Sequence, residues 1–307
     1  MLRRQSNIIL NRAGKIIEPT SIPKYINQLD KPYIYHHIFI KRNKKSDLNK
    51  HLPKHEQIYY IDICRFKQQI LPEGFPKSPL IGWAGLIDMP DGRGVRYARG
   101  YPGGTFELIE PEHTYIRWRN KTGIPVKMHL NIDKNKTTPY KYYCRNEVRG
   151  FHGFCIMRKG EESISRGLYT VDLPSSKYVY PIIIQDCTFY TDGSFSDTGE
   201  VIVVNGKAWP NLNVKRRQYR FYIMNGCAAR HLSIMLSNEL SITVIGRDGG
   251  LLSSPETRKE IPLAPGKIFD ILIDFSDQPK GEKIILFNRA GSPYSDGYAA
   301  NPETSGQ

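Results

Sequence analysis

The sequence predicts an all-β protein built from antiparallel sandwiches, and three observations support this fold class. From Tyr59 onward the chain consists of short runs rich in β-branched and aromatic residues, bounded by Gly, Pro and Asp. Turn signals such as 191–194 and the Asn205-Gly206 pair separate these runs. No convincing amphipathic helix interrupts them, which argues against a parallel α/β fold.

The predicted strands follow one another along both halves of the chain. In the first half they are 59–63, 105–109 and 114–118. Within the last of these, Tyr115 and Arg117 alternate with Ile116 and Trp118, as expected of a strand with one face against a core. In the second half the predicted strands are 180–186, 201–206, 219–224, 241–245 and 269–275.

The N-terminal segment differs from the rest of the chain in polarity and periodicity. Residues 1–56 are polar and weakly periodic, and four prolines break any long helix. We therefore divide the chain into an irregular basic arm (1–56), a first sandwich (57–172) and a second sandwich (173–307).

Composition narrows the class of protein. The 307 residues suffice for two domains, and 39% hydrophobic and 24% charged residues are typical of a soluble globular protein. The N-terminal apolar run is too short for a signal-peptide core, and no stretch is long enough to span a membrane, so we expect a cytoplasmic location by default. The five cysteines lack a CxxC pair, which favours free thiols over a zinc site.

The net charge of +14 is unevenly distributed. Residues 1–150 hold 27 of the 44 basic and 13 of the 30 acidic residues, and the remainder hold 17 of each. A basic half could attract an acidic surface or nucleic acid, but a lysine run is usually a solvated loop. We do not expect nucleic acid as the partner.

Four segments of the second half carry a resemblance to a known family: 204–210, 219–230, 245–252 and 263–275. In this order and spacing they resemble the middle domain of three-domain multicopper oxidases, in the branch of spore-coat laccase and bilirubin oxidase. The resemblance covers about residues 178–290. It implies cupredoxin-like Greek-key sandwiches, and because the family's middle domain is mainly a spacer, it implies no ligands here. We interpret Trp209 as a packing residue.

The first half is similar to the family's N-terminal domain over 101–107 and 110–120. The resemblance implies copper chemistry, in which a His₂Cys site passes electrons to a three-copper cluster held by histidines. The first His-x-His pair should follow the strand that ends at Asn120. There the sequence keeps His129 but places Asn131 at the second position, and an amide is a poorer copper ligand than imidazole. We predict His129 as a vestigial copper-ligand position and predict no catalytic residue.

The remaining family ligands also fail to match. The region of the second pair is shortened and offers Cys144 with no histidine nearby, and we expect the third domain with its His-Cys-His run to be missing. Copper is the family's cofactor, and we expect this chain to bind none or to bind it weakly. It remains open whether the chain is an enzyme, and we expect it to be inactive alone.

The sequence is therefore interpreted as a laccase-like multicopper oxidase relative that is catalytically incompetent as this chain. Two alternatives remain: a fragment of a split or frameshifted oxidase, and a non-catalytic β-sandwich that binds a partner through its basic N-terminal half. The expected partner is a third cupredoxin domain on another chain, or a second copy paired through an open sheet edge, and we expect no membrane partner.

Overall fold

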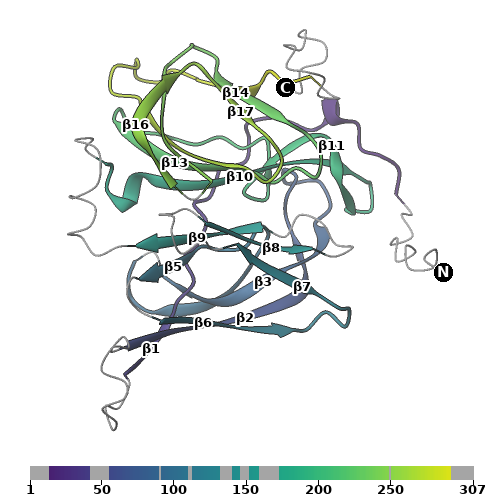
Figure 1. Ribbon diagram of the computed structural model, residues 1–307. Helices are drawn as coiled ribbons and strands as arrows, with labels where there is room; N and C mark the ends of the chain where they lie inside the picture. Colours follow the sequence, from purple (N-terminus) through teal and green to yellow (C-terminus); the bar gives the residue numbers. More distant parts are fainter. Residues whose placement is uncertain are drawn as a thin grey trace, which may run out of the picture.

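The computed structural model consists almost entirely of strands, which form two β-sandwiches one above the other (Figure 1). It describes residues 14–41, 55–89, 91–109, 113–131, 140–145, 152–158, 173–248 and 250–291. Within these residues, no helix has the length and apolar content that crossing a membrane requires. The predicted all-β fold is confirmed.

The first sandwich packs a five-stranded sheet against a four-stranded one, as far as the described residues show. The five-stranded sheet comprises β1 (Ile38–Lys41), β2 (His55–Gln68), β3 (Ser78–Asp88), β4 (Val95–Gly100) and β6 (His113–Asn120), which lies beside β2. The other sheet, in the order β5-β9-β8-β7, comprises β5 (Phe106–Ile109), β9 (His152–Arg158), β8 (Tyr140–Arg145) and β7 (Lys127–Asn131). Because side chains alternate along a strand, Tyr59 and Trp83 reach inward and meet Phe106 in the core.

The second sandwich is larger. Its long sheet contains β12 (Lys207–Ala208), β11 (Phe195–Val204), β10 (Val179–Phe189), β13 (Gln218–Asn225), β18 (Ile268–Asp274), β15 (Ile242–Arg247) and β16 (Gly250–Arg258), in that spatial order. The described part of the opposite sheet contains β17 (Glu260–Leu263), β14 (Leu232–Leu236) and β19 (Leu286–Asn288). Aromatic side chains of β13, with aliphatic side chains from both sheets, fill the space between the sheets. Each strand predicted above lies within one of these elements or overlaps it.

The hairpin between β11 and β12 has the turn that the sequence predicts. Asn205 and Gly206 both have positive φ, 47° and 75°, as a two-residue type I′ turn requires. The Asn205 side chain also accepts a hydrogen bond from the backbone N–H of Ile183 (2.9 Å) and donates one to the carbonyl of Pro181 (3.0 Å). This hairpin is thereby fixed to the start of β10.

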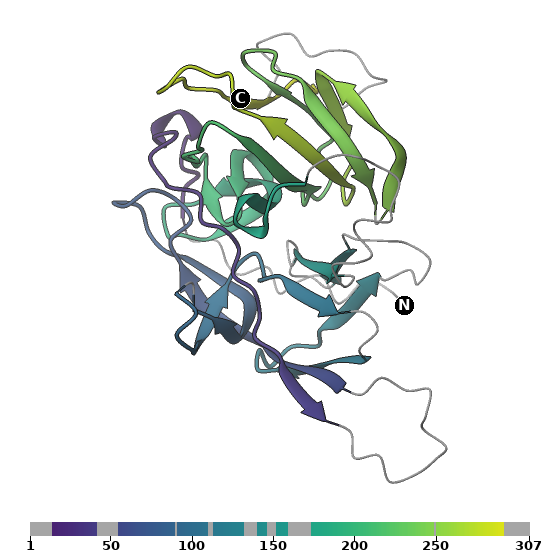
Figure 2. The same cartoon turned by 90° about the vertical axis from the view of Figure 1, so that its left-hand side faces the viewer.

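The N-terminal segment, expected to be an irregular arm, has few regular elements in its described part and packs along both sandwiches. Figure 2 shows it, in purple, running past both sandwiches, and it ends in β1, a strand of the first sandwich. Ile17, Ile22 and Leu29 are buried on the way. Isolated bridges join Gln28 to the second sandwich and Tyr35 to the first. Burial of these apolar side chains holds the described part of the segment against the sandwiches.

A further hydrophobic cluster joins the two sandwiches. It combines residues of the N-terminal segment, of the first sandwich and of β10 to β12, and it includes Tyr101 and Trp209. Gln68 donates a hydrogen bond to the Tyr101 carbonyl (2.7 Å), and Gln185 donates one to the Tyr101 hydroxyl (3.0 Å). The predicted packing role of Trp209 is confirmed, since its side chain is buried in this cluster.

β17 and β19 are the outer strands of the described part of the shorter sheet, and the open edge expected in the second sandwich stays a prediction. Within the described residues β19 pairs with β14 alone, and residues 292–307 lie outside the described part. Self-association through this edge stays a prediction.

Candidate functional site

The predicted copper-ligand position lies on β7, the last strand of the four-stranded sheet. His129 and Asn131 are two residues apart on this strand, so the two positions share one face of the sheet. The structure describes the backbone here, whereas the side chains of β7 and β8 lie outside the described part. The strand thus has the two-residue spacing of a His-x-His pair, but one of the two positions is a histidine and the other is an asparagine.

The strand register identifies the neighbours of these two positions. In the antiparallel pairing of β7 with β8, His129 lies opposite Tyr143 and Asn131 lies opposite Lys141. Tyr143 and Lys141 are the register partners of the pair, so this pairing adds no imidazole. This donor set does not fit a copper cluster held by imidazoles.

The cysteines do not supply the missing donors among the described residues. Cys144 lies on β8 opposite Met128, and nothing further about its side chain is described. Cys155, on the neighbouring strand β9, is fully buried, and burial raises the pKa of its thiol well above its ordinary value. A metal binds the thiolate and not the thiol. Cys155 is therefore a packing residue of the first core.

The histidines of the N-terminal segment form a small cluster that the sequence did not reveal. The Nδ1 atom of His36 lies 2.7 Å from a carboxylate oxygen of Asp88, 52 residues away. His37 packs its ring against Phe39 and Tyr59, and burial together with the charge of His36 lowers its pKa. Within the described residues, no group of three or more His, Cys, Asp or Glu side chains is arranged to hold a metal ion.

The charged residues of the second-half motifs form buried ion pairs. Arg220 of β13 donates two hydrogen bonds to Asp270 of β18, at 2.8 and 2.6 Å. Arg230 lies 3.1 Å from the carboxylate of Asp186. Burial opposes the charge of Arg220, but its hydrogen bonds and attraction to Asp270 raise its pKa. These motif residues therefore hold the sheet together, as expected of a structural domain.

Comparison with known proteins finds similarity to multicopper oxidases and laccases. The family model described as multicopper oxidase matches residues 180–301. The multicopper oxidase LPR1 of Arabidopsis thaliana is 40% identical over an alignment of 280 residues that covers 66% of this chain and 47% of that protein. The laccase of Bacillus subtilis is 29% identical over 294 residues, covering 71% of this chain and 56% of that protein.

Among solved structures, a laccase from Pediococcus acidilactici superposes with a TM-score of 0.66 at 18% identity. The match covers 87% of this chain and 60% of that chain, and at this identity it supports the fold alone. The chain spans about half the length of these two curated relatives.

Proposed function

Because this chain belongs to the multicopper oxidase family, we propose that it preserves the family's first two sandwiches without the capacity to bind the copper cluster or to oxidise a substrate by itself. One observation carries the proposal. The position pair on β7 holds His129 and Asn131, with Lys141 opposite Asn131. An asparagine amide in place of an imidazole removes a cluster ligand.

The proposal concerns these 307 residues, which contain no His-Cys-His run. A blue-copper site would need a thiolate and two imidazoles to hold the copper ion that takes electrons from a substrate. Without such a site, no route exists for electrons to reach a cluster. The two sandwiches then act as a scaffold.

A second candidate is a split oxidase, in which a third cupredoxin domain on another chain completes the site. The observation that favours it is the similarity of both sandwiches to relatives about twice as long. A neighbouring coding sequence with a His-x-x-His-x-His motif and a His-Cys-His run would support this candidate.

Copper content tests the first proposal directly. We expect the purified chain, loaded with Cu(II) and then desalted, to retain well under one copper per chain and to stay colourless. The expected result follows from the missing imidazole and the missing thiolate site. Atomic absorption and the visible spectrum measure it, and one firmly held copper or an intense blue band would contradict it.

Restoring the single imidazole should not restore catalysis. We expect Asn131→His to show no oxygen uptake with a phenolic substrate, because four-electron reduction of oxygen needs a complete cluster and an electron-entry site. Asn238→His, on the exposed surface of the second sandwich, is the matched control for an imidazole added elsewhere. Oxygen uptake by the Asn131→His protein but not by the control would show that β7 contributes to a working site.

A further inference from the structure

The outer face of the five-stranded sheet in the first sandwich gathers exposed tyrosines and arginines from three strands around a leucine of β3. We call it the tyrosine–arginine face. Its members are Tyr60, Leu86, Tyr97, Arg99, Tyr115, Arg117 and Arg119. The register aligns them in rows across the sheet: Leu86 pairs with Tyr97, Tyr60 with Arg117, and Asp62 with both Ala84 and Arg119.

The apolar members of the face are unusually open to solvent. Tyr60, Tyr97 and Tyr115 keep 48%, 47% and 44% of their surface exposed, and Leu86 keeps 37%. The opposite side of the same sheet carries the first core, with Tyr59, Trp83 and their neighbours fully buried. The exposed rings therefore contribute little to this core. Apolar groups gathered on one exposed face often mark an interaction site.

The charges of the face are held in fixed positions. Asp62 is recessed at its centre, where it accepts hydrogen bonds from Arg119 (2.6 and 3.1 Å) and from the Tyr97 hydroxyl (2.5 Å) and pairs with Lys121 (2.7 Å). Burial works against its charge, but these partners outweigh burial and hold the pKa of the Asp62 carboxyl well below its ordinary value. The recessed Asp62 carboxylate thus holds the Arg119 and Lys121 side chains and the Tyr97 ring in place at the surface.

The remaining charges leave the centre of the face positive. Arg99 and Arg117 are exposed, and the Arg117 guanidinium lies 5.7 Å from the centre of the Tyr60 ring. Among the described residues, the other carboxylates on this side, Glu56 and Asp88, lie towards β1, and Asp88 is already paired with His36. A partner that covers the centre therefore meets guanidinium groups between aromatic rings.

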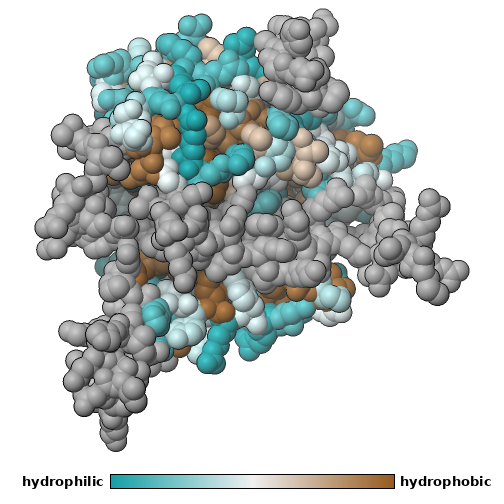
Figure 3. Space-filling view, viewed as in Figure 1, coloured by the Kyte–Doolittle hydropathy of each residue, from teal (hydrophilic) through white to brown (hydrophobic). Residues whose placement is uncertain are grey.

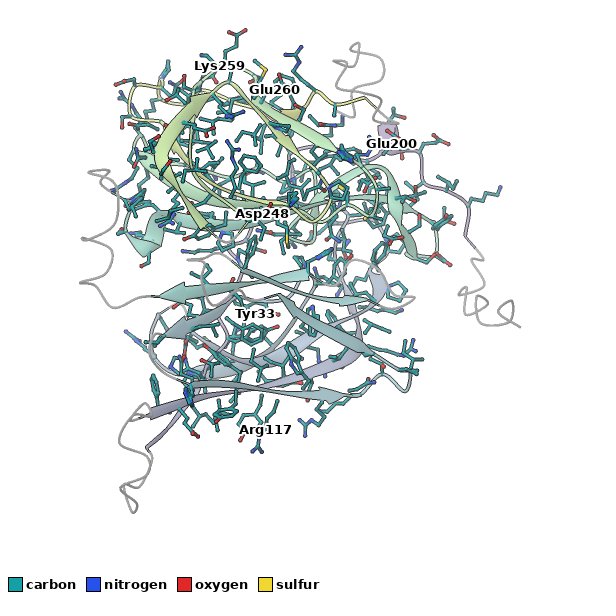
Figure 4. All side chains as sticks on the ribbon, viewed as in Figure 1. Tyr33, Arg117, Glu200, Asp248, Lys259 and Glu260 are labelled. Atoms are coloured by element: carbon teal, nitrogen blue, oxygen red, sulfur yellow. The ribbon has the colours of Figure 1, made fainter. Side chains whose placement is uncertain are left out.

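No described residue outside the first sandwich covers the face. Arg117 projects from the side of the first sandwich that is remote from the second one (Figure 4). In the space-filling view, the lower edge of the first sandwich, where β2 and β6 lie, shows hydrophobic and hydrophilic side chains next to one another (Figure 3). Contact between the two sandwiches uses other surfaces, around Tyr101 and Phe154.

We propose that the tyrosine–arginine face binds an acidic polypeptide segment that carries aromatic or aliphatic side chains among its carboxylates. Arginine pairs with carboxylates through two parallel hydrogen bonds, and exposed tyrosine rings cover apolar side chains at little entropic cost. Tyrosine and arginine are also the residues that dominate the energetics of protein interfaces. Nucleic acid is the competing partner, since guanidinium groups also bind phosphates, and the oligothymidylate probe described below distinguishes it.

This inference does not depend on the copper proposal, since no residue of β7 takes part in it.

The test uses the full metal-free chain and three fluorescein-labelled probes of equal length: a random copolymer of glutamate and tyrosine, polyglutamate, and oligothymidylate. Fluorescence anisotropy measures the dissociation constants at low and high salt. We expect the copolymer to bind most tightly and salt to weaken its binding, because exposed charges are screened.

Substitutions locate the binding on the face. Arg117→Glu and Tyr60→Ser should each weaken binding of the copolymer by about tenfold, as truncation of an interface hot spot does. Lys283→Glu and Tyr25→Ser make equivalent changes at exposed positions away from the face and should bind as the unmodified chain does. Unchanged thermal unfolding midpoints establish that each variant is folded, and Arg117→Gln replaces Arg117→Glu if it is not.

Several outcomes would overturn the inference. One is absence of copolymer binding by the unmodified chain, and another is equal or tighter binding of oligothymidylate. A third is loss of binding in a Lys44→Glu, Lys45→Glu variant with no loss in the face variants, because this would assign the affinity to the basic segment between β1 and β2. Binding that Arg117→Glu and Lys283→Glu weaken equally would indicate net charge alone.

Discussion

Replacing Asp270 with alanine lowers the free energy of unfolding by about 3–5 kcal/mol, the expected cost of removing one partner of a buried ion pair. The Arg220 side chain is 14% exposed and that of Asp270 is fully buried. The substitution leaves a guanidinium in the protein interior without its two charge-assisted hydrogen bonds. Urea unfolding followed by tryptophan fluorescence measures the loss.

Two control variants separate the ion pair from other effects. Glu256 pairs with Arg258 at the surface, where water screens the attraction, so Glu256→Ala should leave the unfolding midpoint nearly unchanged. Replacing both members, Arg220→Met with Asp270→Leu, should recover most of the lost stability because no charge is then left unpaired. An Asp270→Ala protein as stable as Glu256→Ala would mean that water reaches the Arg220 guanidinium.

Gly206→Ala is expected to destabilise the chain by about 2–5 kcal/mol for two reasons that act together. Gly206 has φ of +75°, which costs a residue with a Cβ atom about 1–2 kcal/mol. The added Cβ would also overlap with the Tyr101 carbonyl oxygen and the Gln68 side-chain amide of the first sandwich. Relieving that overlap displaces the contact between the sandwiches, at a further cost of about 1–3 kcal/mol.

Gly281→Ala is the matched control. Its φ is +85° and an added Cβ meets nothing within 4 Å, so only the conformational cost of about 1–2 kcal/mol applies. Urea unfolding gives the difference between the two variants, and hydrogen exchange at Tyr101 reports whether the junction opens. Equal losses in both variants, with unchanged exchange, would show that the junction tolerates the extra methyl group.

Local sequence patterns determined much of the fold. Runs of β-branched and aromatic residues between Gly, Pro and Asp predicted parts of β2, β5, β6 and five strands of the second sandwich, β10, β11, β13, β15 and β18. Along β6 the residues also alternate, because burial of one sheet face imposes a period of two on the sequence itself. The Asn205-Gly206 turn was predictable for a similar reason, since only a few residue types tolerate positive φ. The family resemblance, which the comparisons confirm, arose from the order of such segments. The expectation that Asn131 stands where the family has a histidine also came from the sequence alone and stays a prediction.

The tertiary structure alone decided which distant residues meet. The pairing of Arg220 with Asp270, the packing of Ile17 and Ile22 between the sandwiches, and the His36 contact with Asp88 join residues that are far apart in the sequence. The tyrosine–arginine face likewise exists because strand register aligns β2, β3, β4 and β6. The physical reason is that register and sheet order depend on the balance of burial over the whole domain, and no local run of residues contains that balance.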